Sequence, residues 1–274
     1  MEDDNNNSET EQDKLRIYLL PNLFTGGNLF CGFLAITKIV EADLVAPFPA
    51  IKQALFLILL ACILDLLDGR VARLGGYESP FGREFDSLAD IVSFGVAPAF
   101  LVHRVVLRDV FANVPQLGWF IASVYLICGA FRLARFNCLA DMPKEKDDNA
   151  FLGFPIPAAA GMVASLTWLL MSWDEKDFTQ GSWRYILPVI LLMLSFMMVS
   201  EVEYPSFKKI TWKTRHPFRK MVLVMLVFAF VLLQWEILLP VLSPLFFTAY
   251  LIYGFVRKRI SAQMRRDLEN AGEE

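Results

Sequence analysis

Four aspartates in two neighbouring apolar stretches are the residues best suited to chemistry. Asp65 and Asp68 are three positions apart and Asp86 and Asp90 are four apart, so each pair shares one face of a helix. A carboxylate at the middle of a membrane helix costs about 2.5–3.5 kcal/mol on insertion scales, and four near helix ends still need compensation. Converging carboxylates repel one another, and one or two divalent cations relieve that repulsion. Oxygen ligands favour Mg²⁺ or Mn²⁺, with a substrate phosphate completing the coordination.

The chain between the two pairs makes the two helices antiparallel neighbours. The loop at residues 74–81 is short, and Gly75 and Gly76 supply a turn. Ser79 followed by Pro80 is typical of a helix N-cap with proline at the first helical position. The four carboxylates are therefore expected to converge on one site near the helix ends.

Small and basic residues extend the aspartate face. Ala72 and Arg73 follow Gly69 toward the end of the first helix, and Gly82 lies near the start of the second. The two glycines permit either close helix packing or the approach of a diphosphate to the backbone. A single juxtamembrane charge usually marks a helix end, but the complete set at this spacing favours a metal site.

The composition is that of an integral membrane protein. Of the 274 residues, 55% are hydrophobic and 20% are charged, and the mean hydropathy is +0.44. Soluble domains are nearer 45–50% apolar and about 25% charged, so most soluble classes are excluded. The ends, residues 1–13 and 267–274, carry ten acidic and no basic side chains, which leaves 19 acidic against 26 basic side chains elsewhere. No nucleic-acid partner is expected.

Apolar stretches of about 20 residues recur along the chain, which predicts an all-α membrane protein. About eight transmembrane helices are expected, at residues 20–41, 49–70, 86–107, 116–136, 153–173, 183–201, 218–235 and 237–256. The last two should form a tight hairpin. We expect one membrane catalytic domain, 17–260, between an acidic disordered tail, 1–16, and a charged tail, 261–274.

The distribution of basic residues predicts the orientation of the spans. With both termini in the cytoplasm, 20 of the 26 Lys and Arg residues fall on the cytoplasmic side. This asymmetry supports an even number of spans, and it places the aspartates at the cytoplasmic face. The expected location is the plasma (inner) membrane of a prokaryote.

Residues 65–90 together have the pattern D-x2-D-G-x2-A-R-x8-G-x3-D-x3-D. This pattern resembles the signature of the CDP-alcohol phosphatidyltransferases. The resemblance implies a six-helix catalytic core, a homodimer and a metal-dependent transfer. In that reaction a phosphatidyl group moves from CDP-diacylglycerol to an alcohol, and CMP is released.

The resemblance also implies roles for individual residues. The expected metal ligands are Asp65, Asp68, Asp86 and Asp90, with Asp90 also acting as the base that deprotonates the alcohol. The residues expected to contact the CDP-lipid are Gly69, Ala72, Arg73, Ser79, Gly82, Asn22 and Thr25. Two divalent ions fit the two-metal pattern of phosphoryl transfer.

Four further stretches resemble the phosphatidylserine synthase branch of that family. They are residues 20–25, 90–98, 131–137 and 154–161, within a likeness that runs from about residue 17 to 200. Together they favour L-serine as the acceptor. Arg132, Arg135 and Asn137 are candidates to bind it, because an arginine fork matches a carboxylate. The two arginines also fit ordinary positive residues at a cytoplasmic helix end.

Three alternatives follow from the same residues. The resemblance to this family also leaves open glycerol 3-phosphate or an inositol phosphate as the acceptor, and an archaeol-based lipid as the donor. A cation transporter would also place carboxylates in membrane helices. The clustering of the aspartates at one face, without a carboxylate chain through the other spans or an inverted repeat, argues against transport.

Overall fold

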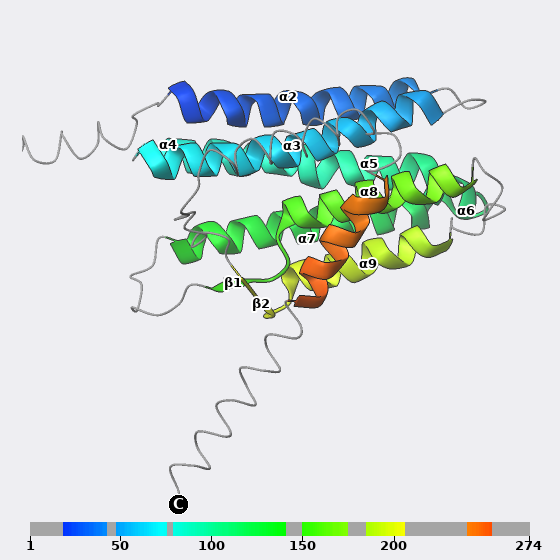
Figure 1. Ribbon diagram of the computed structural model, residues 1–274. Helices are drawn as coiled ribbons and strands as arrows, with labels where there is room; N and C mark the ends of the chain where they lie inside the picture. The colour runs from blue at the N-terminus through cyan, green and yellow to red at the C-terminus, as the bar shows by residue number, and fades with distance from the viewer. Residues whose placement is uncertain are drawn as a thin grey trace, which may run out of the picture.

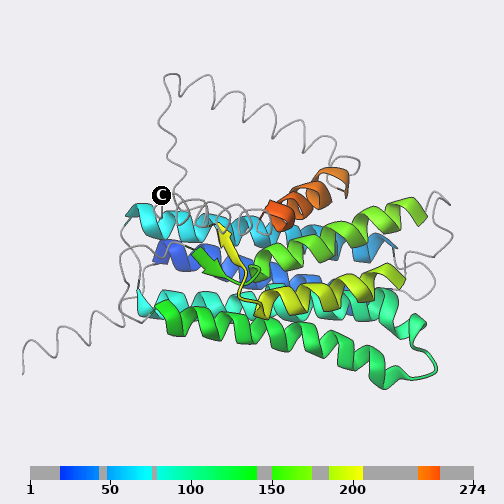
Figure 2. The same cartoon turned by 90° about the horizontal axis from the view of Figure 1, so that it is seen from below.

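The computed structural model describes residues 19–42, 48–75, 79–140, 150–174, 185–205 and 240–253, which form a bundle of helices with one short sheet. The long helices are α2 (Leu19–Glu41), α3 (Phe48–Gly75), α7 (Pro115–Ala140), α8 (Ile156–Asp174) and α9 (Ile186–Val199). A further helix spans Pro240–Tyr253. In both views it lies on the outside of the bundle and runs obliquely to the other helices (Figure 1, Figure 2).

The third membrane span is a continuous helical segment, Pro80–Val110, with two π-helical turns. Its parts are α4 (Pro80–Asp90), η1 (Ile91–Val96), α5 (Ala97–Val102), η2 (His103–Leu107) and α6 (Arg108–Val110). Ser79 caps the start of α4, as the sequence predicts, because its hydroxyl accepts a hydrogen bond from the Gly82 amide at 3.0 Å. The cap and the following proline explain why this span begins six residues before the expected residue 86.

Five described helices are long and apolar enough to cross a membrane, and Ile186–Val199 and Pro240–Tyr253 are shorter apolar helices. The predicted all-α membrane fold is confirmed. The predicted span at 218–235 lies outside the described residues, as do the two tails. Of the expected hairpin, the structure describes part of the last helix, Pro240–Tyr253.

The helices pack so that the predicted site residues lie at one end of the bundle. Helix α2 packs along α3 and also against α4, η1 and α5, while α7 packs against η1 and α9, and α8 packs against α3. In Figure 1 the start of α2, the end of α3, the start of α4 and the end of α7 all lie at the left. The sequence predicts that the two aspartate helices are direct neighbours, but α4 and η1 pack mainly on α2, which also packs along α3. Helix α2 therefore links the two helices that carry the aspartates.

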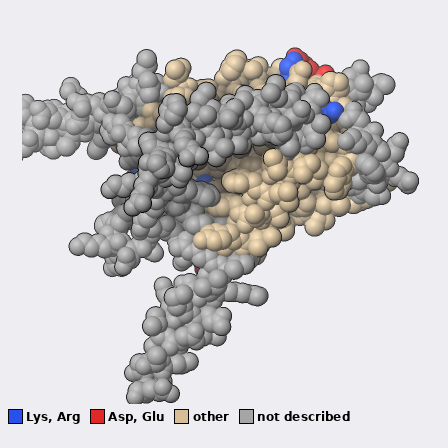
Figure 3. Space-filling view, in the orientation of Figure 1, with Lys and Arg blue, Asp and Glu red and all other residues tan. Residues whose placement is uncertain are grey.

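The outer surface of the bundle is apolar. Large side chains such as Leu23, Phe131 and Phe196 are 66–75% exposed, and the described helices show a largely uncharged face in Figure 3. The largest fully buried side chains include Trp168, Tyr125 and Phe94. Exposed apolar side chains of this size are expected where helices face lipid instead of water.

A two-stranded sheet joins the segment before α8 to the segment after α9. Strand β1 (Ala150–Leu152) pairs antiparallel with β2 (Glu203–Pro205). Gly153 follows β1 with φ of +80°, and a Cβ there would lie 2.8 Å from Nη2 of Arg135. Glycine is therefore required at this turn, both for the left-handed backbone and for the close approach of Arg135.

We predict that Tyr125→Phe destabilises the bundle by about 1 kcal/mol, because the Tyr125 hydroxyl donates to the backbone oxygen of Phe94 within η1 at 3.1 Å. Thermal unfolding of the purified protein in detergent measures this as a lower Tm. Tyr185→Phe is the matched control, since Tyr185 is 69% exposed and should leave the Tm unchanged. Equal Tm values for the two variants would contradict the prediction.

Candidate functional site

Three of the four predicted aspartates form a compact group. Asp65 and Asp68 come from α3 and Asp86 from α4, and one carboxylate oxygen of each lies within 4.8 Å of the other two. Divalent ions bind oxygen at about 2.0–2.6 Å, so oxygens at this separation can share one ion. Oδ1 of Asp86 is buried and has no hydrogen-bond partner among the described residues. Both observations fit a site for Mg²⁺ or Mn²⁺.

Asp90 is placed differently from the other three. It lies one helical turn beyond Asp86, is 6% exposed and falls outside the three-carboxylate group. Its carboxyl lies beside that of Asp65, and its Oδ1 accepts a hydrogen bond from Nδ2 of Asn28 at 3.3 Å. The structure thus brings the four predicted aspartates together, but it gives Asp90 surroundings of its own.

Helix α2 supplies hydrogen bonds to two of the carboxylates. Oγ1 of Thr25 donates to Oδ2 of Asp68 at 3.1 Å, and Asn28 donates to Asp90. From the sequence, Thr25 is expected to contact the CDP-lipid, whereas Asn28 has no predicted role. A signal was present, because the two polar residues are three positions apart on an apolar helix and so share a face.

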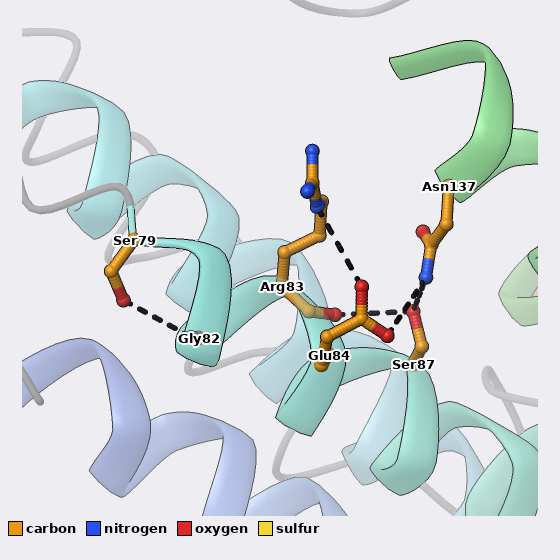
Figure 4. Close-up of polar contacts among 6 residues, drawn as sticks. All are labelled: Ser79, Gly82, Arg83, Glu84, Ser87 and Asn137. Carbon is orange, nitrogen blue, oxygen red and sulfur yellow. Dashed lines mark hydrogen bonds and ion pairs between the residues drawn. The ribbon is translucent and has the colours of Figure 1, made fainter. Parts of the chain in front are cut away.

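Three residues expected to bind the CDP-lipid lie together at the start of α4. A Cβ on Gly82 would lie 3.3 Å from Oγ of Ser79 and 3.5 Å from Oδ1 of Asn22, and Figure 4 shows Ser79 beside the backbone of Gly82. Nδ2 of Asn22 is buried without a hydrogen-bond partner in the described part of the chain. This corner therefore holds an unused donor for a ligand.

The remaining CDP-lipid candidates lie on α3. Gly69 and Ala72 are half-buried in its last turns. Arg73 belongs to the same helix, but its side chain lies outside what the structure describes. The positions of these three residues on α3 agree with the predicted extension of the aspartate face toward the end of that helix.

The three residues expected to bind serine have different surroundings. The Arg135 guanidinium donates to the backbone oxygens of Met198, Val199 and Ser200 at 3.0–3.4 Å. It thereby caps the last turn of α9. Nδ2 of Asn137 donates to Oγ of Ser87 at 2.9 Å and lies 3.5 Å from Oε2 of Glu84 (Figure 4). Both side chains are thus engaged in contacts between helices.

Arg132 faces the carboxylates instead. It is 7% exposed, and its charge interacts with Asp90 and Asp65. Its guanidinium carbon lies 5.6 Å from the centre of the Phe136 ring, and its Nε has no hydrogen-bond partner among the described residues. A buried guanidinium with an unused donor can receive an anionic group next to the aspartates.

Taken together, these side chains can hold a cation, an anionic group and a proton acceptor within one end of the bundle. Such a combination suits phosphoryl transfer, in which positioning and neutralisation of charge supply most of the catalysis. The sequence matches the CDP-alcohol phosphatidyltransferase family over residues 18–200. The chain belongs to this family.

Several relatives that are named for an activity align with most of the chain. A Helicobacter pylori protein named CDP-diacylglycerol–serine O-phosphatidyltransferase is 38% identical over 242 residues, which are 88% of this chain and 91% of that protein. A Bacillus subtilis protein of the same name is 34% identical and covers 69% of this chain and 92% of its own length. A Methanothermobacter thermautotrophicus protein named archaetidylserine synthase is 34% identical and covers 68% and 69%.

We predict that Asp68→Asn and Asp86→Asn each weaken Mn²⁺ binding at least tenfold, because each removes a charged ligand from the three-carboxylate group. Titration of Mn²⁺ into the purified protein, followed by electron paramagnetic resonance, measures the loss. Glu41→Gln is the control: Glu41 lies at the other end of α2 and pairs with Lys38 at 3.0 Å. Unchanged Mn²⁺ affinity in both aspartate variants would contradict the metal assignment.

Proposed function

We propose that this chain transfers the phosphatidyl group of CDP-diacylglycerol to L-serine, giving phosphatidylserine and CMP. The observation that carries the proposal is the group formed by Asp65, Asp68 and Asp86, with Asp90 buried beside it. It occurs in a chain that is 38% identical over 242 residues to a protein named for this reaction. The donor set and the relative thus support the same chemistry.

We propose two divalent ions, Mg²⁺ or Mn²⁺, at this site. Asp65, Asp68 and Asp86 would hold the first, and Asp90 would contribute to the second, as the family signature implies. When bound, such ions neutralise the diphosphate of the substrate and the charge of the departing CMP. Arg73 and the corner formed by Asn22, Ser79 and Gly82 would contact the CDP-lipid.

Asp90 would act as the general base. It receives the proton of the serine hydroxyl, and the oxygen attacks the phosphorus that carries diacylglycerol. A new oxygen–phosphorus bond forms, and the bond from that phosphorus to the bridging oxygen of the diphosphate breaks. CMP leaves with that bond's electron pair. A carboxylate within reach of the hydroxyl proton is the first requirement of a general base.

Arg132 is the residue best placed to bind the serine carboxylate. It is buried, its charge interacts with that of Asp90, and its Nε has no hydrogen-bond partner among the described residues. Arg135, by contrast, is engaged with three backbone oxygens at the end of α9. Because a guanidinium binds a carboxylate through two parallel hydrogen bonds, Arg132 would also fix the direction of the serine hydroxyl. Arg135 and Asn137 would then support the site through helix contacts.

We further propose that the site faces the cytoplasm in the plasma membrane of a prokaryote and that the protein is a homodimer. The orientation is supported by the excess of Lys and Arg on the side of the α3–α4 connection. A cytoplasmic site would give direct access to the water-soluble substrate, serine. The homodimer is proposed from the family resemblance.

We predict that the purified protein with Mn²⁺ incorporates labelled L-serine into lipid and releases CMP. Asp90→Asn should lower kcat at least a hundredfold and leave binding of CDP-diacylglycerol within about threefold, because a base acts in the transition state. Glycerol 3-phosphate, inositol phosphate and CDP-archaeol are tested in parallel, the last because one relative is named archaetidylserine synthase. Incorporation of another acceptor but not serine would reject the proposed acceptor.

We predict that Arg132→Gln raises KM for serine at least tenfold, because the neutral amide loses the charge paired with the carboxylate. KM for CDP-diacylglycerol should change less than threefold. Arg104→Gln is a matched control, since Arg104 lies far along the same bundle and donates to the backbone oxygen of Ala42 at 2.7 Å. Equal effects of Arg132→Gln on both KM values would contradict the assignment.

A further inference from the structure

Asn28 is a buried amide that neither the family signature nor the proposed reaction assigns. It is 0% exposed within α2, a helix whose other residues are mainly apolar. Its Nδ2 donates to Oδ1 of Asp90 at 3.3 Å. A buried amide is costly unless it is hydrogen-bonded, so this contact accounts for a polar residue at this position.

The surroundings of Asn28 hold it against Asp90. Oγ of Ser93, in the π-helical turn η1 directly after Asp90, donates to the backbone oxygen of Asn28 at 2.9 Å. One turn further along α2, a Cβ on Gly32 would lie 2.7 Å from Cα of Ser93. The two helices therefore approach as closely as a glycine allows, and the hydrogen bond from Ser93 fixes their relative register.

The second polar atom of the Asn28 side chain is also informative. Oδ1 is buried and has no hydrogen-bond partner among the described residues. Most buried polar side-chain atoms in proteins are hydrogen-bonded, so an amide placed for packing alone would have both ends satisfied. Here one end contacts a carboxylate of the site and the other is unused.

We propose that Asn28 is a positioning residue for Asp90, which holds Oδ1 of the carboxylate and leaves its other oxygen for the hydroxyl of the acceptor. This inference rests on the proposed function, in which Asp90 is the base. Nδ2 of Asn28 is a hydrogen-bond donor only, so it binds a carboxylate oxygen of Asp90 and restricts rotation of the Asp90 side chain. The π-helical turn and Gly32 set the depth at which the amide meets Asp90.

A comparison within α2 separates this role from metal binding. Thr25 lies one turn before Asn28 and donates to Asp68, a member of the three-carboxylate group. Loss of the Thr25 contact should act on the affinity for the cation, because partners of metal ligands commonly contribute tenfold to a hundredfold to that affinity. Loss of the Asn28 contact should lower kcat even at saturating Mn²⁺, because Asp90, besides its proposed share in the second ion, takes part in the chemical step as the base.

The first experiment compares Asn28→Ala, Asn28→Asp and Asn28→Gln in the full chain, purified in detergent with saturating Mn²⁺. Asn28→Ala and Asn28→Asp should lower kcat tenfold to a hundredfold, with KM for serine and CDP-diacylglycerol within threefold. Asn28→Gln retains the donor and should recover part of kcat. Thr25→Val should instead raise the Mn²⁺ concentration required for half-maximal rate.

Ser195→Ala is the control for removing a buried polar group from a membrane helix. Ser195 is 1% exposed, and its hydroxyl donates to the backbone oxygen of Leu191 in its own helix at 2.7 Å. Its kcat should stay within twofold of wild type. A kcat for Asn28→Ala within twofold of wild type, or a loss of the same size in Ser195→Ala, overturns the proposal.

A second measurement does not depend on turnover. The Tm values of Asn28→Ala, Asp90→Asn and the double variant form a cycle, and contact between the side chains predicts that the two single shifts do not add. Additive shifts overturn the contact. Absence of CMP release from the wild type with every acceptor would reject the proposed function, whereas the cycle still tests the Asn28–Asp90 contact.

Discussion

The cost of placing carboxylates inside apolar helices governs the arrangement of this bundle. Four aspartates in α3 and α4 would repel one another and lose solvation, so each needs a compensating partner. A hydroxyl and an amide from α2 donate hydrogen bonds to two of the carboxylates, and the charge of a guanidinium from α7 interacts with Asp90 and Asp65. The three-carboxylate group itself fits a divalent ion. Helices that lie far apart in the chain are thereby required to meet at one end.

Much of the fold could be predicted because membrane helices obey length and hydropathy. The expected span at 20–41 agrees closely with α2, and the Ser79-Pro80 pair predicts the capped start of α4. The spacing and the short connection predict that all four aspartates converge on one site. In the structure Asp65, Asp68 and Asp86 form the compact group, whereas Asp90 lies outside it. These predictions rest on residues that lie within a few helical turns of one another in the sequence.

The rest depends on contacts between distant segments, which periodicity does not report. Asn28 and Asp90 are 62 positions apart, and Arg135 meets backbone oxygens 63–65 positions away. The sequence pattern around an arginine near a helix end is the same whether its side chain binds a carboxylate or caps another helix. The packing of α7 against α9 brings Arg135 to the backbone oxygens at the end of α9. The charge of Arg132 interacts instead with Asp90 and Asp65.

Discrimination among acceptors must come from outside the aspartate helices. In the proposed function, the signature residues on α3 and α4 would bind what the donors of the family share, a diphosphate with its cations. Serine differs from other acceptors by a carboxylate and an ammonium group on a small frame, so it needs a charge placed at a fixed distance from the base. In the proposed function, Arg132 on α7 would provide this charge, which interacts with Asp90, and Asn28 on α2, which donates a hydrogen bond to Asp90, would hold the carboxylate in place. A base fixed between two helices can serve a small acceptor, because such a substrate offers few contacts of its own with which to orient the hydroxyl.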